Sequence, residues 1–222
     1  MKRLSLAIAA ALLVAVPIAA QDSHEWDGLT KVRSPHMDAV YLLPGADFSA
    51  YTKVKLDPTE VSFRRNWQRD YNANADITAR ISDDEARQMA GRVQTGFENI
   101  FAEAYRQAGF QVVTEAGPDV LRLRTGVVDL YIDAPERMTP GITRTYSVEA
   151  GEATLVIEAR DSVTGALLGR AVDRRTLGDM PGLRTRVSNE ADAEQLFRSW
   201  ARTSVRGLET LKGQSPASTP AR

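Results

Sequence analysis

The chain has 222 residues, of which 43% are hydrophobic and 26% are charged, and it contains no cysteine. The missing thiols exclude a disulfide-stapled mini-protein, a zinc ribbon and an enzyme with a cysteine nucleophile. Lys and Arg together number 28 and Asp and Glu together number 29. This balance excludes nucleic acid as an expected partner, because the chain supplies no strong positive field.

Residues 1–20 have the pattern of a secretory signal peptide. Lys2 and Arg3 supply the positive start, an uncharged apolar run follows over residues 4–16, and small residues precede the expected cleavage after Ala20. The alternative is a retained membrane anchor, but the apolar run is shorter than the roughly 20 residues that span a bilayer. We therefore expect export and removal of this segment.

The residue after the expected cleavage site bears on membrane attachment. Residues 18–20 resemble the start of a lipobox, yet Gln21 stands where the lipidated cysteine would be. Without a thiol no lipid anchor forms. The sequence therefore predicts a periplasmic protein that is not lipid-anchored.

Residues 21–44 show little periodicity and are punctuated by Gly and Pro, which predicts an irregular leader that ends in a short strand at 39–43. One domain is expected over residues 45–213. Its first strand carries alternating apolar residues on both sides of Pro58, with a change of parity there. A proline in such a pattern indicates a bulge or a sheet edge.

Residues 82–108 carry the clearest local signal. Ser82 and Glu85 have the spacing of a capping box, and Gly109 is suited to the left-handed end of a helix. Apolar residues recur between them at helical spacing, so the sequence predicts a long amphipathic helix. Its charged face is interpreted as solvated.

The following third of the chain is rich in strand patterns. Short alternation at 110–113 is followed by a strand over 121–132, whose apolar residues change parity at Gly126. A second alternating strand over 153–160, a turn, and a return strand over 168–176 predict an antiparallel hairpin.

A second long helix is predicted near the C-terminus. Asn189 is suited to the N-cap, and Gly213 to the end. Residues 214–222 are mainly Ser, Pro, Ala and Thr, which predicts a disordered tail. The expected buried stripe of the helix is Ala193, Leu196, Phe197, Trp200, Ala201, Val205, Leu208 and Leu211.

These elements together predict an α+β two-layer sandwich, with a mainly antiparallel sheet and the two long helices packed on one face. Two helices with single apolar stripes need such a sheet to cover them. The expected core residues are Phe97, Ile100, Leu155, Ile157, Phe197 and Trp200.

Several segments resemble the bacterial envelope family catalogued as domain of unknown function 3313. They are Asp27-Gly28-Leu29, residues 44–51, 57–58, 66–67 and 119–135, and the stretch from Gly151-Glu152 through the turn Asp161-Ser162-Val163-Thr164-Gly165 to Asp173-Arg174-Arg175. Members are typically lipoproteins, from which this sequence departs at Gln21. The resemblance implies an envelope address and a shared fold, and it implies no catalytic residues.

The most unusual local composition interleaves arginines with aromatic residues. Arg64, Arg65, Trp67, Arg69 and Tyr71 follow the end of a predicted strand, and guanidinium groups beside aromatic faces suit anionic or sugar ligands. These five residues are the candidate ligand- or partner-binding site. The alternative is structural: the two aromatic residues would peg a connection to the sheet, while the arginines pair with acids.

Other catalytic or metal-binding patterns are weak. The two histidines, His24 and His36, both lie in the leader at a spacing that matches no recognised metal site, and no nucleophile elbow or phosphate-binding loop occurs. The carboxylates that could form an acid and base pair beside a glycan are Asp129, Asp133, Glu149 and Glu152.

The sequence therefore favours an exported cell-envelope protein that acts as a non-enzymatic binding or assembly module, with no metal and no cofactor. Its expected partners are an envelope protein, peptidoglycan, or a second copy bound through a sheet edge. The alternative is a small glycan-binding or hydrolytic module that uses residues 64–71.

Overall fold

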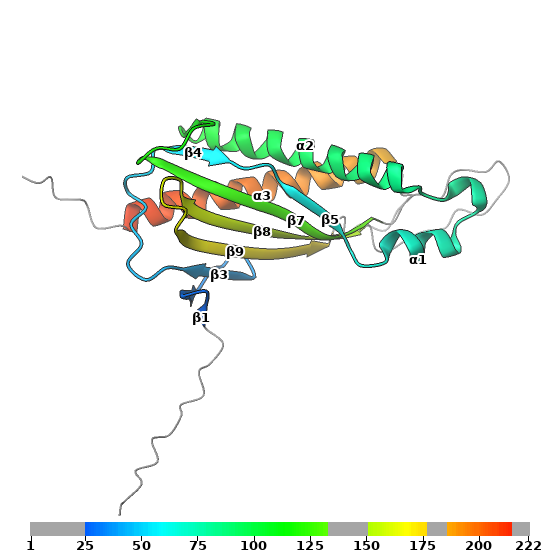
Figure 1. Cartoon of the computed structure of the whole chain (residues 1–222), viewed down its shortest axis with the longest axis horizontal. Coiled ribbons are helices and arrows are strands. Elements are labelled where there is room, and N and C mark those ends of the chain that lie inside the picture. The colour runs from blue at the N-terminus through cyan, green and yellow to red at the C-terminus, as the bar shows by residue number, and fades with distance from the viewer. Residues whose placement is uncertain (1–24, 133–150, 177–185, 215–222) are drawn as a thin grey trace, which may run out of the picture.

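The computed structural model describes residues 25–132, 151–176 and 186–214 (Figure 1). Over these residues nine strands form one sheet, two long helices cover one of its faces, and a short helix lies beyond one end. The predicted α+β two-layer sandwich is confirmed. In chain order the elements are β1 (Glu25–Trp26), β2 (Leu29–Val32), β3 (Ala39–Leu42), β4 (Lys53–Leu56), β5 (Glu60–Phe63), α1 (Trp67–Asn74), the 3-10 turn η1 (Ile77–Ala79), α2 (Asp83–Gln107), β6 (Gln111–Val112), β7 (Val120–Ile132), β8 (Gly151–Asp161), β9 (Leu167–Thr176) and α3 (Arg186–Gln214).

The strands lie in the order β1-β2-β3-β9-β8-β7-β4-β6, and β5 also pairs with β7. Every neighbouring pair from β1 to β7 is antiparallel, whereas β4 and β5 run parallel to β7. Parallel pairing follows from the chain path, since α2 carries the chain back between these strands. The sheet is thus mainly antiparallel, with a parallel arm.

Pro58 separates β4 from β5, as the change of parity predicted. Leu56 lies opposite Leu123 and Glu60 lies opposite Gly126, so the segment around Pro58 holds one more residue than the facing part of β7. An extra residue of this kind is the defining feature of a bulge.

The apolar pattern of β7 changes face later than predicted. The change expected at Gly126 is wrong, because Thr125 and Val127 are both buried on the same face. The hydroxyl of Thr125 is satisfied there by a 2.8 Å hydrogen bond with the hydroxyl of buried Thr59. The register with β8 slips only around Asp129, whose φ of 51° marks the kink.

The long helix α2 confirms its sequence signals. The hydroxyl of Ser82 accepts from the backbone N–H of Glu85, whose carboxylate accepts from the backbone N–H of Ser82. Gly109 follows the helix with φ 85°, a left-handed conformation that suits glycine. Phe97, Phe101 and Tyr105 form the buried stripe.

Helix α3 begins at Arg186, three residues before the predicted cap, so Asn189 lies within the helix. Asparagine inside a helix costs only a fraction of a kcal/mol, and burial of the apolar stripe outweighs that cost. The helix ends at Gln214, one residue past the predicted stop. The eight stripe residues are all buried or half-buried.

The short strand expected at 39–43 is confirmed as β3, whereas the irregular structure expected before it is wrong for its described part, since β1 and β2 also extend the sheet there. Asp27 and Gly28, with φ of 55° and 76°, make a two-residue turn between β1 and β2. Asp-Gly is a strong hairpin signal for this reason, although no alternation surrounds it. The expected signal peptide, residues 1–20, and residues 215–222 of the expected tail lie outside the described residues, while the first residue of that expected tail, Gln214, belongs to α3.

The core lies between the sheet and the two long helices. Five of the six predicted core residues are buried and Ile100 is half-buried. Leu155 and Ile157 of β8 face Phe97 of α2 and Trp200 of α3 within one cluster. None of the helices in the described part of the chain combines the length and hydropathy needed to cross a membrane.

Candidate functional site

The segment 64–71 connects β5 to α1. Asn66 adopts a left-handed conformation with φ 64°, and α1 begins at the next residue. Trp67 is only 3% exposed, and its indole N–H donates to the carbonyl of Ile132 at 2.8 Å. Its ring stacks on Phe63 with centroids 4.3 Å apart. Trp67 thus lies where a structural peg would lie, because a binding anchor needs an exposed ring.

The three arginines of this segment differ in their surroundings. Arg64 forms an ion pair with Glu152 and lies 4.9 Å from the centroid of the Tyr131 ring. Arg65 is exposed. Arg69 is exposed too and pairs with its neighbour Asp70 at 3.0 Å. Arg64 is therefore held against β8, whereas Arg65 and Arg69 are exposed.

Tyr71 is half-buried, and its ring centroid lies 6.3 Å from that of Trp67. The two aromatic residues continue the stack that Phe63 begins. They fasten α1 to the end of the sheet.

Carboxylates on the strands are held in ion pairs. Glu152 pairs with Arg174 and Arg64, and the hydrogen bond from Arg174 lowers the pKa of Glu152 although partial burial opposes it. Burial raises the pKa of Glu158, but hydrogen bonds from two arginines outweigh it and leave that pKa lowered. Both groups are ionised at neutral pH and hold neighbouring strands together through their ion pairs.

Other sequence candidates do not come together. Asp129 is exposed at its kink, while Asp133 and Glu149 lie outside the described residues. His36 is exposed in the loop after β2, and His24 lies outside the described residues. No group of three or more potential metal ligands occurs among the residues that the structure describes.

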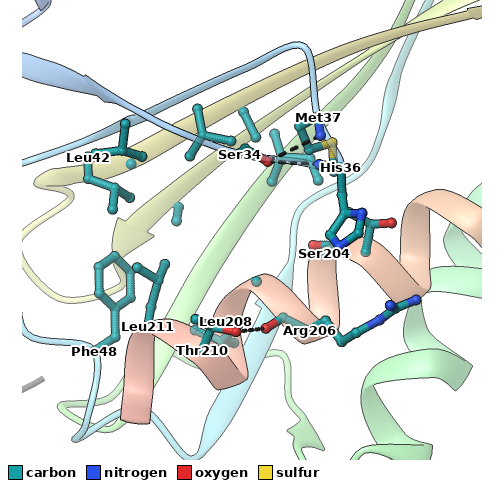
Figure 2. A pocket seen from close by; sticks show the side chains of 18 of the residues that line it. Ser34, His36, Met37, Leu42, Phe48, Ser204, Arg206, Leu208, Thr210 and Leu211 are labelled. Carbon is teal, nitrogen blue, oxygen red and sulfur yellow. Dashed lines mark hydrogen bonds between the residues drawn. The ribbon is translucent and has the colours of Figure 1, made fainter. Parts of the chain in front are cut away.

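A groove that the sequence analysis missed lies between α3 and the sheet. It has a volume of about 490 Å³ and is lined by residues of the 32–42 stretch, by Phe48 and Tyr105, by residues of β7, β8 and β9, and by α3 from Thr203 onward (Figure 2). We call it the α3 groove. Most of its lining is aliphatic or aromatic.

Two backbone features shape the α3 groove. At Gly169 an added Cβ would lie 2.9 Å from the Leu42 side chain, so β3 approaches β9 closely there. At Gly207 on α3 an added Cβ would meet nothing within 4 Å. The first glycine lets the walls meet, and the second leaves the groove open.

Several of the polar groups that line the α3 groove are satisfied by hydrogen bonds. The hydroxyls of Tyr105 and Ser204 share a 2.7 Å hydrogen bond. Burial raises the pKa of Tyr105 to about 12, so the phenol is neutral at physiological pH. The hydroxyl of Ser34 accepts from the backbone N–H groups of His36 and Met37 and holds that loop in place (Figure 2).

Asp173 ties the walls of the α3 groove together. Its carboxylate is fully buried and accepts from the indole N–H of Trp200 at 2.8 Å, from Nε of Arg175 at 2.7 Å and from the backbone N–H of Asp38 at 3.2 Å. In return, Asp38 accepts from the backbone N–H of Arg174. One side chain of β9 thus fixes both α3 and the loop after β2. In the sequence, Asp173 stands among the polar residues at the end of a strand, and nothing there indicates this role.

Comparison with known proteins places the chain in a family. No curated protein matches it. Among solved structures, the PelC dodecamer from Paraburkholderia phytofirmans is 15% identical, with 74% of this chain and 94% of that chain covered and a TM-score of 0.34. A minor lipoprotein from Acinetobacter baumannii is 13% identical, with 75% and 97% covered and a TM-score of 0.34.

Protein XCC0632 from Xanthomonas campestris is 11% identical, with 77% of this chain and 90% of that chain covered and a TM-score of 0.37. At these values none of the three structures indicates what this chain binds or does. The family is shown by a sequence model. The model described as protein of unknown function (DUF3313) matches residues 20–204, and the chain therefore belongs to the DUF3313 family.

Proposed function

We propose that the protein is an exported, non-enzymatic binding module of the cell envelope that holds an apolar ligand in the α3 groove. The observation that carries the proposal is the groove itself. Its volume of about 490 Å³ falls within the usual range of small-molecule sites, roughly 300 to 1,000 Å³, and its mostly apolar lining is typical of them.

The state of the carboxylates supports binding rather than catalysis. A general acid of the glycosidase type needs a carboxyl whose pKa is raised, whereas the pKa values of Glu152, Glu158 and Asp161 are lowered by the donors around them. These groups lie on strand faces and in the β8–β9 turn. They are placed to hold strands together.

Export rests on the first 20 residues. The positive start, the apolar run and the small residues before Gln21 support cleavage after Ala20, and a chain without cysteine cannot carry the usual lipid anchor. Mass spectrometry of the cell-produced protein should give a chain that begins at Gln21, in the periplasmic fraction. Recovery of the chain with Met1, or only from membranes, would contradict export in soluble form.

The binding proposal is tested with the uncharged fluorescent probe N-phenyl-1-naphthylamine. We expect its fluorescence to rise on binding to the wild-type protein. Gly207→Leu should weaken binding at least tenfold, because the new side chain enters space that is open in the wild type. Leucine also favours a helix more than glycine does, so the variant should fold.

The matched control is Gly91→Leu on α2. Gly91 is also helical and exposed, an added Cβ there meets nothing within 4 Å, and it does not line the groove. Gly91→Leu should bind the probe as the wild type does. Equal probe binding by both leucine variants would overturn the proposal.

Two further surfaces stay as proposals. A glycan or peptidoglycan partner at residues 64–71 would use Arg65 and Arg69, which are both exposed. Self-association would use a sheet edge, where β1 and β6 each offer two residues; short edge strands limit such pairing. Co-sedimentation with peptidoglycan and analytical ultracentrifugation test these two surfaces.

A further inference from the structure

The α3 groove has a one-sided charge. None of the described residues that line it is Asp or Glu, although the chain contains 29 acidic residues. Its lining includes Arg33, Arg170 and Arg206 together with His36. A lining of this kind attracts negative groups and repels positive ones.

Two of the three arginines keep their charge available. Arg170 is neutralised by Glu158 and Asp27, with N–O distances of 2.7 and 2.9 Å. Arg33 and Arg206 are exposed, and no carboxylate among the described residues lies within ion-pair distance of either. The excess positive charge of the groove therefore comes from Arg33 and Arg206.

The charge and the apolar surface lie at different ends. Figure 2 shows Leu42, Phe48 and Leu211 gathered at one end, whereas His36 and the side chain of Arg206 lie toward the other. Arg33 belongs to the same loop as His36. A ligand that matches this layout has a long apolar tail and a single anionic head.

We infer that the α3 groove binds a single-chain anionic amphiphile, a free long-chain fatty acid, with its alkyl chain toward Phe48 and its carboxylate toward Arg33 and Arg206. The inference rests on the proposed function, since it names the ligand class of the same groove. Binding should strengthen about fourfold for each added methylene until the apolar end is filled. An arginine at the rim can meet the carboxylate while the groove stays dry.

Isothermal titration calorimetry at low salt tests the inference with three probes that each have a twelve-carbon chain, the carboxyl carbon of dodecanoate included, all below their micelle concentrations: dodecanoate, dodecyltrimethylammonium and uncharged dodecyl maltoside. We expect dodecanoate to bind at least tenfold more tightly than the cationic probe. The double variant Arg33→Gln with Arg206→Gln should lose that preference and keep its affinity for the maltoside.

The matched control is Arg202→Gln. Arg202 is exposed on α3 one turn before Arg206 and does not line the groove, so it should leave dodecanoate binding within twofold of the wild type. Arg206→Lys should retain most of the preference, because the charge stays. A dodecanoate preference that is unchanged in the double variant would overturn the assignment of Arg33 and Arg206.

The outcomes separate this inference from the proposed function. If Gly207→Leu abolishes probe binding while the three head groups bind alike, the groove binds ligands but the inference is overturned. If Gly207→Leu changes neither N-phenyl-1-naphthylamine nor dodecanoate binding, the proposed function is overturned and the inference with it. A preference for the cationic head would also overturn the inference.

Discussion

Replacement of Asp173 should destabilise the protein more than replacement of an exposed ion-pair residue. Asp173→Ala removes the acceptor of the indole N–H of Trp200, which is itself buried. An unsatisfied buried donor costs about 1 to 3 kcal/mol. The variant also loses the hydrogen bonds that the backbone N–H of Asp38 and Nε of Arg175 donate to the carboxylate. Water can replace the carboxylate for Arg175, which is half-exposed. We expect a loss of about 3 to 5 kcal/mol.

Asp173→Asn separates the charge from the shape. The amide oxygen can still accept from Trp200, whereas the attraction to Arg175 is lost, so we expect a loss of about 1 to 2 kcal/mol. The control is Asp70→Ala, whose exposed ion pair with Arg69 should contribute about 0 to 1 kcal/mol. Urea unfolding followed by circular dichroism gives the free energy of unfolding of each variant.

If the free energy of unfolding of Asp173→Ala is within about 1 kcal/mol of the wild-type value, Asp173 contributes no more than an exposed charge does, and its role as a buried acceptor is refuted. Because Asp173 also holds the loop after β2 through Asp38, the folded fraction of Asp173→Asn should bind N-phenyl-1-naphthylamine more weakly. Wild-type probe binding would show that this loop holds its position by other contacts.

Three further predictions follow from burial and charge. Ile157→Asp places a carboxylate at a core position that is 6% exposed and should cost several kcal/mol, on the order of 3 to 5; near-wild-type thermal unfolding would contradict the assigned face of β8. Trp67→Ala should lower the free energy of unfolding by about 3 to 5 kcal/mol, while Arg65→Ala and Arg69→Ala should lower it by about 0 to 1 kcal/mol. If the stable arginine variants co-sediment less with peptidoglycan, the result supports the 64–71 proposal. Unaltered co-sedimentation would end that proposal. The lowered pKa of Glu158 contributes stability that is fully present above its unfolded pKa of about 4.3 and is lost as the pH falls through the folded pKa. Glu158→Gln should therefore flatten the loss of stability on acidification below the unfolded pKa.

Sequence patterns were sufficient where the determining contacts are local. The α2 cap needs only Ser82 and Glu85, which are three residues apart, and both were identified. The β8–β9 hairpin is similar, because Asp161 accepts from the backbone N–H groups of Val163 and Thr164 within the turn. Such signals lie within a few residues, so a single sequence carries them.

Prediction failed where the partner is distant in the chain. The sequence places the kink of β7 at Gly126, because a polar residue at position 125 looks like the end of the buried face. Thr125 is in fact buried, since its hydroxyl bonds to that of Thr59, which is distant in the chain. The sequence alone does not decide whether Trp67 is a binding anchor or a structural peg, since its exposure depends on contacts such as the one with the Ile132 carbonyl. Neither contact leaves a periodic trace in the sequence.

The α3 groove was missed for a related reason, and its origin is geometric. Strands lie about 4.8 Å apart, so the eight strands from β1 to β6 along the sheet path span roughly 34 Å, whereas two helices packed side by side cover only about 20 Å. The helix α2 contacts the parallel arm and α3 packs on α2, so the cover ends over β9 and β3. The apolar face beyond α3 is left partly open there, and that open strip is the groove. A longer side chain at Gly207 would fill this strip. Probe binding by Gly207→Leu therefore tells whether the strip is a binding site or only an incompletely covered part of the core.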